Sequence, residues 1–243
     1  MARGDKACGP IVIVGGYITL PVNYRKLKRI LTDLSGSETY VVPLTPLDWL
    51  LGRFRGYGQL VFEVASVVDR ALLESESDRA VLIGHSAGGI LARTYIGGDP
   101  PYGGRRYSGH RRVSHLITLG TPHKVPAEGR LAPIAEADEL FPGALHENIR
   151  YLSVAGAAVD GGSSQTARKR YEHFIGDGRV KGDGLVPVES ALLSGTEHLV
   201  LDELYHGRLY GGLWGRWYGA DRETVERWWP EGLRAADAGT NAL

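Results

Sequence analysis

The sequence has few features that would place the protein outside the ordinary globular class. It contains one cysteine, Cys8, in 243 residues, so no disulfide can form within the chain and the fold does not depend on an oxidising compartment. Its 28 basic and 28 acidic residues cancel, which gives no electrostatic reason to expect nucleic acid or an anionic membrane as a partner.

Long hydrophobic runs are also lacking. The first apolar run, residues 11–14, is stopped by Gly15-Gly16 after four residues, whereas the hydrophobic part of a signal peptide needs roughly 7–15 residues. No stretch approaches the roughly 18 apolar residues of a membrane-spanning helix. We therefore expect a cytoplasmic protein without a membrane span.

Motifs for cofactors and metals are missing as well. Gly15-Gly16-Tyr17 follows an apolar run, but the G-x-G-x-x-G of a dinucleotide site is not there, and neither is a P-loop. No cluster of histidine and cysteine has the spacing of metal ligands. We expect no cofactor and no catalytic metal.

Six short apolar runs, rich in Val, Ile and Leu, recur along the chain. They are nearly continuous rather than alternating, which is typical of strands covered on both faces. The runs are Pro10–Gly15, Thr39–Leu44, Arg79–Gly84, Val113–Gly120, Ile149–Gly156 and Glu197–Asp202.

Helical patterns lie between these runs. Apolar residues recur at a spacing of three to four over residues 57–74, and Tyr24–Leu34 and Ala87–Ile96 are similar. Strands that alternate with helices form right-handed βαβ units. The sequence therefore predicts an α/β fold with a doubly wound, mainly parallel six-stranded sheet.

The chain order favours a single domain over residues 1–230, followed by a flexible tail over 231–243 that is small and polar. Three long segments interrupt the alternation of strands and helices, at 97–112, 124–148 and 157–182. Loops of this length are more often functional than idle, so these segments are candidates for a lid.

The sharpest motif is Gly84-His85-Ser86-Ala87-Gly88, a G-x-S-x-G between a predicted strand and a predicted helix. A serine at such a turn has its hydroxyl raised above the carboxyl end of the sheet, and the flanking glycines avoid collisions with neighbouring backbone. The start of the helix favours negative charge beside the serine. Ser86 is the predicted nucleophile.

With this motif the sequence resembles the α/β-hydrolases, in particular small bacterial lipases and esterases. The resemblance extends from Pro10 to about Gly207 and rests also on Gly15-Gly16-Tyr17, on Gly120-Thr121-Pro122-His123 and on Gly182–Pro187. The last two motifs are similar to those of lipases and of the inositol deacylases that trim GPI anchors. The resemblance implies the minimal six-stranded version of the fold.

The family's chain order of nucleophile, acid and histidine implies that Asp183 and His206 complete a catalytic triad with Ser86. Asp183 lies in a glycine-flanked turn after the fifth predicted strand, and His206 follows the end of the last strand by four residues. The imidazole would take the serine proton while the carboxylate holds its tautomer.

Other residues compete for these roles. Asp177, which also lies between two glycines, and Asp160 are alternative acids. His198 is an alternative histidine, but it begins the last strand, at the end of the sheet away from the site. His85 is expected to point away from the site, and His123 is expected to order a loop rather than catalyse.

The resemblance further implies that the backbone N–H groups of Tyr17 and Ala87 form an oxyanion hole. The family's first loop usually begins with His-Gly, whereas this chain has Gly15-Gly16. The bracing histidine of that loop is therefore replaced by Gly15.

Aromatic residues are the least specific signal. Trp49, just beyond the second strand, is a candidate for lining an acyl pocket, with plain packing as the alternative. Packing of a final helix, about Arg222–Trp229, is the main interpretation of an aromatic cluster near the C-terminus, and a lipid-facing or dimer surface is the alternative. The cluster contains Tyr205, Tyr210, Trp214, Trp217, Tyr218, Trp228 and Trp229.

Together these features predict a serine hydrolase that cleaves carboxylic esters, a lipase or carboxylesterase acting on ester or lipid small molecules. Acyl transfer or thioester cleavage by the same three residues is an alternative. A non-catalytic ligand-binding module of the same fold is another.

Overall fold

The central sheet is formed by six parallel strands in the order β2-β1-β3-β4-β5-β8. The computed structural model describes residues 8–17, 19–125, 134–207 and 215–235. Each predicted run overlaps one strand, so the predicted fold class is confirmed. The strands are Ile11–Val14 (β1), Thr39–Val41 (β2), Ala80–His85 (β3), Val113–Leu119 (β4), Arg150–Gly156 (β5) and Glu197–Leu201 (β8).

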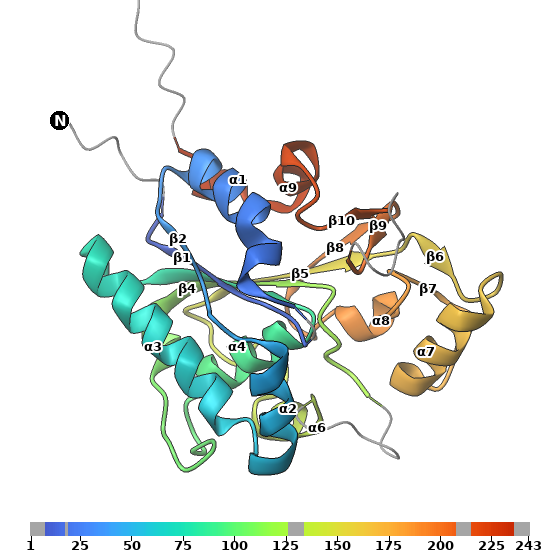
Figure 1. Ribbon diagram of the computed structural model, residues 1–243, viewed down its shortest axis with the longest axis horizontal. Coiled ribbons are helices and arrows are strands. Elements are labelled where there is room, and N and C mark those ends of the chain that lie inside the picture. The colour runs from blue at the N-terminus through green and yellow to red at the C-terminus, as the bar shows by residue number, and fades with distance from the viewer. Residues whose placement is uncertain (1–7, 18, 126–133, 208–214, 236–243) are drawn as a thin grey trace, which may run out of the picture.

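Helices cover both faces of this sheet (Figure 1). Helices α1 (Arg25–Ser35) and α9 (Arg222–Trp228) lie on one face, and α3 (Gly58–Ser75) and α4 (Ala87–Gly97) lie on the other. The three helical patterns of the sequence and the predicted final helix are therefore present, within a residue or two at each end.

Strand β1 shows why its sequence is apolar at every position. Ile11 and Ile13 belong to the core cluster that contains residues of α1 and α9, whereas Val12 and Val14 belong to the cluster that contains residues of α3. Successive side chains of a strand point to opposite faces. A strand with helices on both sides therefore has no position at which water would solvate a polar side chain.

Helix α2 (Pro46–Arg55) was not predicted, although its start has a recognisable signal. Thr45 and Asp48 form a capping box, with Pro46 in the first turn. These residues satisfy backbone N–H groups that have no partner inside the helix. The apolar periodicity used for the other helices is weaker here because the helix also exposes Leu47, Leu50, Leu51 and Phe54.

The three long segments contain regular elements of their own. They include α5 (Gly109–Arg112), α6 (Ile134–Leu140), α7 (Gln165–Ile175) and the antiparallel pair β6 (Val159–Asp160) and β7 (Lys181–Gly182). Residues 126–133 of the second segment lie outside the described residues. A lid function for any of the three segments stays a prediction.

The C-terminal region differs from expectation at its beginning. Residues 231–235, expected to belong to a flexible tail, include the 3-10 turn η3 (Glu231–Leu233), and the side chain of Leu233 is buried. The Ala235 N–H donates to the carbonyl of Leu34 in α1 at 2.8 Å. Burial of one leucine and a backbone hydrogen bond hold this segment on the domain, while 236–243 lie outside the described residues.

The remaining elements are the 3-10 turn η1 (Pro21–Tyr24), the short helix α8 (Val188–Ala191) and the paired strands β9 (Leu204–Tyr205) and β10 (Arg216–Trp217). Within the described ranges, no helix combines the length and the hydropathy needed to cross a membrane. Because the six strands of the main sheet are parallel, the loops after their carboxyl ends meet at one edge of the sheet, where Ser86 and His206 lie.

Candidate active site

Ser86 occupies a strained turn between β3 and α4. Its φ of 54° and ψ of −133° lie in a region of backbone angles that residues other than glycine rarely adopt. A Cβ on Gly84 would lie 2.3 Å from the Cα of Gly89, and one on Gly88 would lie 2.2 Å from the carbonyl oxygen of Val14. Only glycine fits at either position, because the strand, the turn and the helix approach each other this closely.

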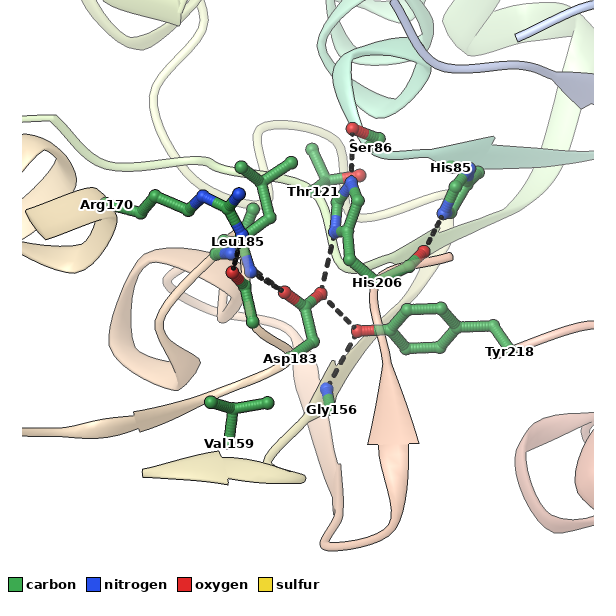
Figure 2. Close-up of polar contacts among 12 residues, drawn as sticks. His85, Ser86, Thr121, Gly156, Val159, Arg170, Asp183, Leu185, His206 and Tyr218 are labelled. Atoms are coloured by element: carbon green, nitrogen blue, oxygen red, sulfur yellow. Dashed lines mark hydrogen bonds and ion pairs between the residues drawn. The ribbon is translucent and has the colours of Figure 1, made fainter. Parts of the chain in front are cut away.

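The structure brings the three predicted triad side chains together (Figure 2). The Nε2 of His206 is 2.8 Å from the Oγ of Ser86, and its Nδ1 is 2.8 Å from the Oδ2 of Asp183. A carboxylate accepts hydrogen bonds only, so Nδ1 carries the proton and Nε2 is the acceptor for the serine hydroxyl. Both His206 and Asp183 are buried, which shields this chain of contacts from water.

Asp183 accepts four hydrogen bonds. Its Oδ1 receives the backbone N–H groups of Leu185 and Val186 at 3.0 and 2.8 Å. Its Oδ2 receives the Nδ1–H of His206 and the hydroxyl of Tyr218, the latter at 2.9 Å. Both lone pairs of each oxygen are thereby engaged, so the carboxylate has one defined orientation and its charge is stabilised in a buried site.

The rival residues have other partners. The Oδ1 of Asp177 accepts the backbone N–H of Arg179, and the Oδ1 of Asp160 accepts that of Gly162, both in exposed turns. The Nε2 of His198 lies 2.7 Å from the carbonyl of Leu193. Each of these side chains therefore makes a local contact, and Asp183 is the carboxylate that contacts His206.

Tyr218 was missed as a site residue by sequence reasoning. It is fully buried, and its hydroxyl accepts the N–H of Gly156 at 2.8 Å while it donates to Asp183. Burial, and then the neighbouring carboxylate, raise its pKa well above the usual value, so it remains a donor. The sequence signal was only its membership of an aromatic cluster, which says nothing about the partner of its hydroxyl.

The loop after β1 lies against the nucleophile. A Cβ on Gly16 would lie 2.8 Å from the Cβ of Ser86, so Tyr17 follows the point of closest approach. Ala87 is the first residue of α4, directly after the serine. Both predicted oxyanion donors therefore belong to segments that border Ser86.

His85, the residue before the nucleophile, is buried. Its Nδ1 lies 2.8 Å from the hydroxyl of Tyr24. Its Nε2 lies 2.8 Å from the backbone carbonyl of His206 (Figure 2). Burial and the nearby His206 lower its pKa to about 3. A neutral ring that bonds to a backbone carbonyl is a structural partner of the site rather than a proton carrier at neutral pH.

His123 also has structural contacts. Its Nε2 lies 3.1 Å from the hydroxyl of Thr118, and its Nδ1 lies 3.2 Å from the guanidinium of the buried Arg93. Burial and the positive charge of Arg93 lower its pKa well below the usual value. These contacts fit the expected role of ordering the loop after β4.

Trp49 is 1% exposed, and its ring meets the ring of Tyr17 edge to face at 5.7 Å between centroids. It belongs to the core cluster between the sheet and α3, which favours the packing interpretation. Its contact with Tyr17 nevertheless connects α2 to the predicted oxyanion loop. In the part of the chain that the structure describes, no group of three metal-binding side chains is found.

The two buried histidines predict a loss of stability in mild acid. His85 and His123 are neutral when folded, but below pH ~6.5 the unfolded chain protonates both. Lowering the pH therefore favours unfolding, by about 2 kcal/mol for His85 between pH 6.5 and 5, and His123 adds to the loss in the same direction. Urea denaturation at pH 7.5, 6 and 5 measures this, and for His85 the loss continues down to its folded pKa of about 3.

The matched variants for this measurement are His85→Asn and His173→Gln. The first is expected to reduce the pH slope, and the second, on the exposed surface of α7, is expected to leave it unchanged. A free energy of unfolding that stays constant from pH 7 to 5 would contradict the prediction.

Part of the chain matches a known sequence family, and its fold matches solved structures. The PGAP1-like alpha/beta domain family matches residues 61–131, which include the serine turn and Gly120–His123. No curated protein matches the sequence significantly.

Among solved structures, EstA from Clostridium botulinum is 14% identical, with a TM-score of 0.58 over 96% of this chain and 89% of EstA. A presumed hydrolase of the alpha/beta superfamily from Xanthomonas campestris is 15% identical, with a TM-score of 0.49 over 90% of this chain and 98% of the other. Phospholipase PlaB from Legionella pneumophila is 16% identical, with a TM-score of 0.48 over 82% of this chain. The match spans only 54% of the PlaB chain.

EstA shares the overall fold of this chain at low sequence identity. The family model matches the region of the serine turn, and this turn directly follows β3 of the parallel sheet. The chain therefore has the fold of EstA, and its residues 61–131 are similar to the PGAP1-like alpha/beta domain family.

Proposed function

We propose that the protein is a serine hydrolase of carboxylic esters. The observation that carries this proposal is the continuous contact from Ser86 through His206 to Asp183, with 2.8 Å at each step and the two latter side chains buried. Such an arrangement activates a serine hydroxyl as a nucleophile.

The proposed reaction has two stages. His206 takes the proton of Ser86 as the Oγ attacks the ester carbonyl, and then gives it to the leaving alcohol. A water molecule activated by His206 in the same way then attacks the acyl-enzyme, which breaks the bond to Oγ, releases the carboxylic acid and returns a proton to Ser86. Asp183 holds the tautomer throughout and stabilises the imidazolium that forms.

The oxyanion is assigned to the N–H groups of Tyr17 and Ala87. Support comes from the approach of the β1 loop to Ser86 and from the start of α4 directly after it. Each donor of this kind contributes about 3 kcal/mol to stabilisation of the transition state.

For the substrate class we propose a lipase or carboxylesterase that acts on acyl esters. Support comes from Gly120-Thr121-Pro122-His123 and Gly182–Pro187, which resemble lipase motifs, and from the PGAP1-like family match.

A series of p-nitrophenyl esters from acetate to palmitate tests this function. We expect hydrolysis with a preferred chain length, because an acyl pocket of fixed depth stabilises one length best. A fluorophosphonate probe should label Ser86, and prior labelling should abolish turnover. Turnover that goes mainly to an added alcohol acceptor would indicate acyl transfer instead. A protein that neither turns over any ester nor reacts with the probe would exclude the hydrolase and favour a binding module.

A further inference from the structure

A chain of hydrogen bonds connects the loop after β1 to the backbone of His206. The N–H of Gly16 donates to the hydroxyl oxygen of Tyr24 at 2.9 Å. The same oxygen lies 2.8 Å from Nδ1 of His85, whose Nε2 lies 2.8 Å from the carbonyl of His206. Tyr24 and His85 are both buried.

The chemistry of the two ends determines where the protons lie. The carbonyl of His206 can only accept, so Nε2 of His85 carries its proton. Because burial holds the His85 pKa at about 3, the ring is neutral and Nδ1 is a free acceptor. The hydroxyl of Tyr24 therefore donates to His85 and accepts from Gly16, and each contact in the chain has one donor and one acceptor.

Tyr24 also packs against Thr19, which holds the peptide group that contains the Tyr17 N–H. The hydroxyl of Thr19 donates to the carbonyl of Gly16 at 2.7 Å. The Tyr24 oxygen lies 3.2 Å from the Thr19 oxygen, and this is a packing contact because the single hydroxyl proton of Tyr24 is donated to His85. The carbonyl of Gly16 and the N–H of Tyr17 belong to one planar peptide unit. Holding the carbonyl therefore fixes the direction in which the Tyr17 N–H points.

The room for Tyr24 comes from Gly15. A Cβ at this position would lie 2.7 Å from Cε2 of the Tyr24 ring and 3.0 Å from the Thr19 hydroxyl. Gly15 has no side chain, and the Tyr24 ring occupies the space where one would lie. The ring of His85 is enclosed on its other sides by Trp217, Tyr218 and His206, with centroids 5.2–6.0 Å away.

We propose that Tyr24 and His85 are positioning residues that hold the Tyr17 N–H in place relative to Ser86 and His206. The proposal rests on the hydrolase function proposed above. It predicts that the two residues act as one unit on the transition state, since both belong to the same chain of contacts, and that neither contacts the substrate.

The test compares Tyr24→Phe, His85→Asn and the double variant with wild type. We expect Tyr24→Phe to lower kcat for the preferred ester about 10- to 100-fold, somewhat less than outright loss of an oxyanion donor, with KM changed less than about two-fold. Inhibition by a trifluoromethyl ketone, whose adduct carries an oxyanion, should weaken by the same factor. The double variant should lose about as much as the more impaired single variant.

Tyr151→Phe is the matched control. The Tyr151 hydroxyl likewise accepts a backbone N–H, that of His146 at 3.2 Å, but it lies at the beginning of β5, at the opposite end of the sheet. This variant should retain the wild-type kcat. Amide hydrogen exchange followed by NMR supplies a readout that does not require activity, and Tyr24→Phe should accelerate exchange at Gly16.

The outcomes separate the two proposals. A folded Tyr24→Phe with wild-type kcat and ketone affinity would overturn the positioning role, and so would a double variant whose loss equals the product of the single losses. A wild type that neither hydrolyses esters nor reacts with a fluorophosphonate would refute the hydrolase function itself. In that case, unchanged exchange at Gly16 in Tyr24→Phe would show in addition that Tyr24 does not brace the loop.

Discussion

Replacing Ser86 by alanine is expected to lower kcat for p-nitrophenyl esters by about a million-fold. The variant has no oxygen at the position 2.8 Å from the Nε2 of His206, so no acyl-enzyme can form. The oxyanion donors and the binding surface remain, and they leave a small residual acceleration over water. Steady-state kinetics and loss of fluorophosphonate labelling measure the effect.

Ser66→Ala is the matched control, since Ser66 lies on α3 and its hydroxyl bonds only locally, to the carbonyl of Phe62 at 2.9 Å. It should keep wild-type kcat. Substantial activity or labelling in Ser86→Ala would show that the nucleophile is another residue.

Replacing Asp183 by asparagine is expected to lower kcat by about 10⁴-fold through the tautomer of His206. The two backbone N–H groups at Oδ1 require an oxygen there, so the amide nitrogen must replace Oδ2. That nitrogen would then face two donors, the Nδ1–H of His206 and the hydroxyl of Tyr218. The imidazole would avoid the clash by moving its proton to Nε2, where it can no longer accept the proton of Ser86.

Asp177→Asn and Asp160→Asn are the controls for this prediction. Both side chains cap exposed local turns, so both variants should have kcat close to wild type. A greater loss in Asp177→Asn than in Asp183→Asn would assign the acid to the rival residue. Circular dichroism would check that each variant is folded.

Local patterns were sufficient for the sheet and for the turn at Ser86. A strand with helices on both sides must be apolar at every position, so β1 and β3 are visible as continuous runs. Gly84 and Gly88 are required by backbone contacts within a few residues of the serine or on the adjacent strand. Helix α2 was not predicted because both of its faces carry apolar residues, although the capping box at Thr45 marks its start.

For the candidate site, the sequence by itself indicated Ser86, Asp183 and His206 through motif and chain order, but it left Asp177, Asp160 and His198 as alternatives. The tertiary structure decided which carboxylate contacts which imidazole, and it added Tyr218, Tyr24 and His85 to the site. Tyr218 bonds to Asp183 across 35 positions of the chain, Tyr24 to His85 across 61, and His85 to the backbone of His206 across 121. Hydropathy and spacing report whether a side chain is buried. The partner of a buried hydroxyl or ring nitrogen depends on how distant elements pack, which only the folded chain determines.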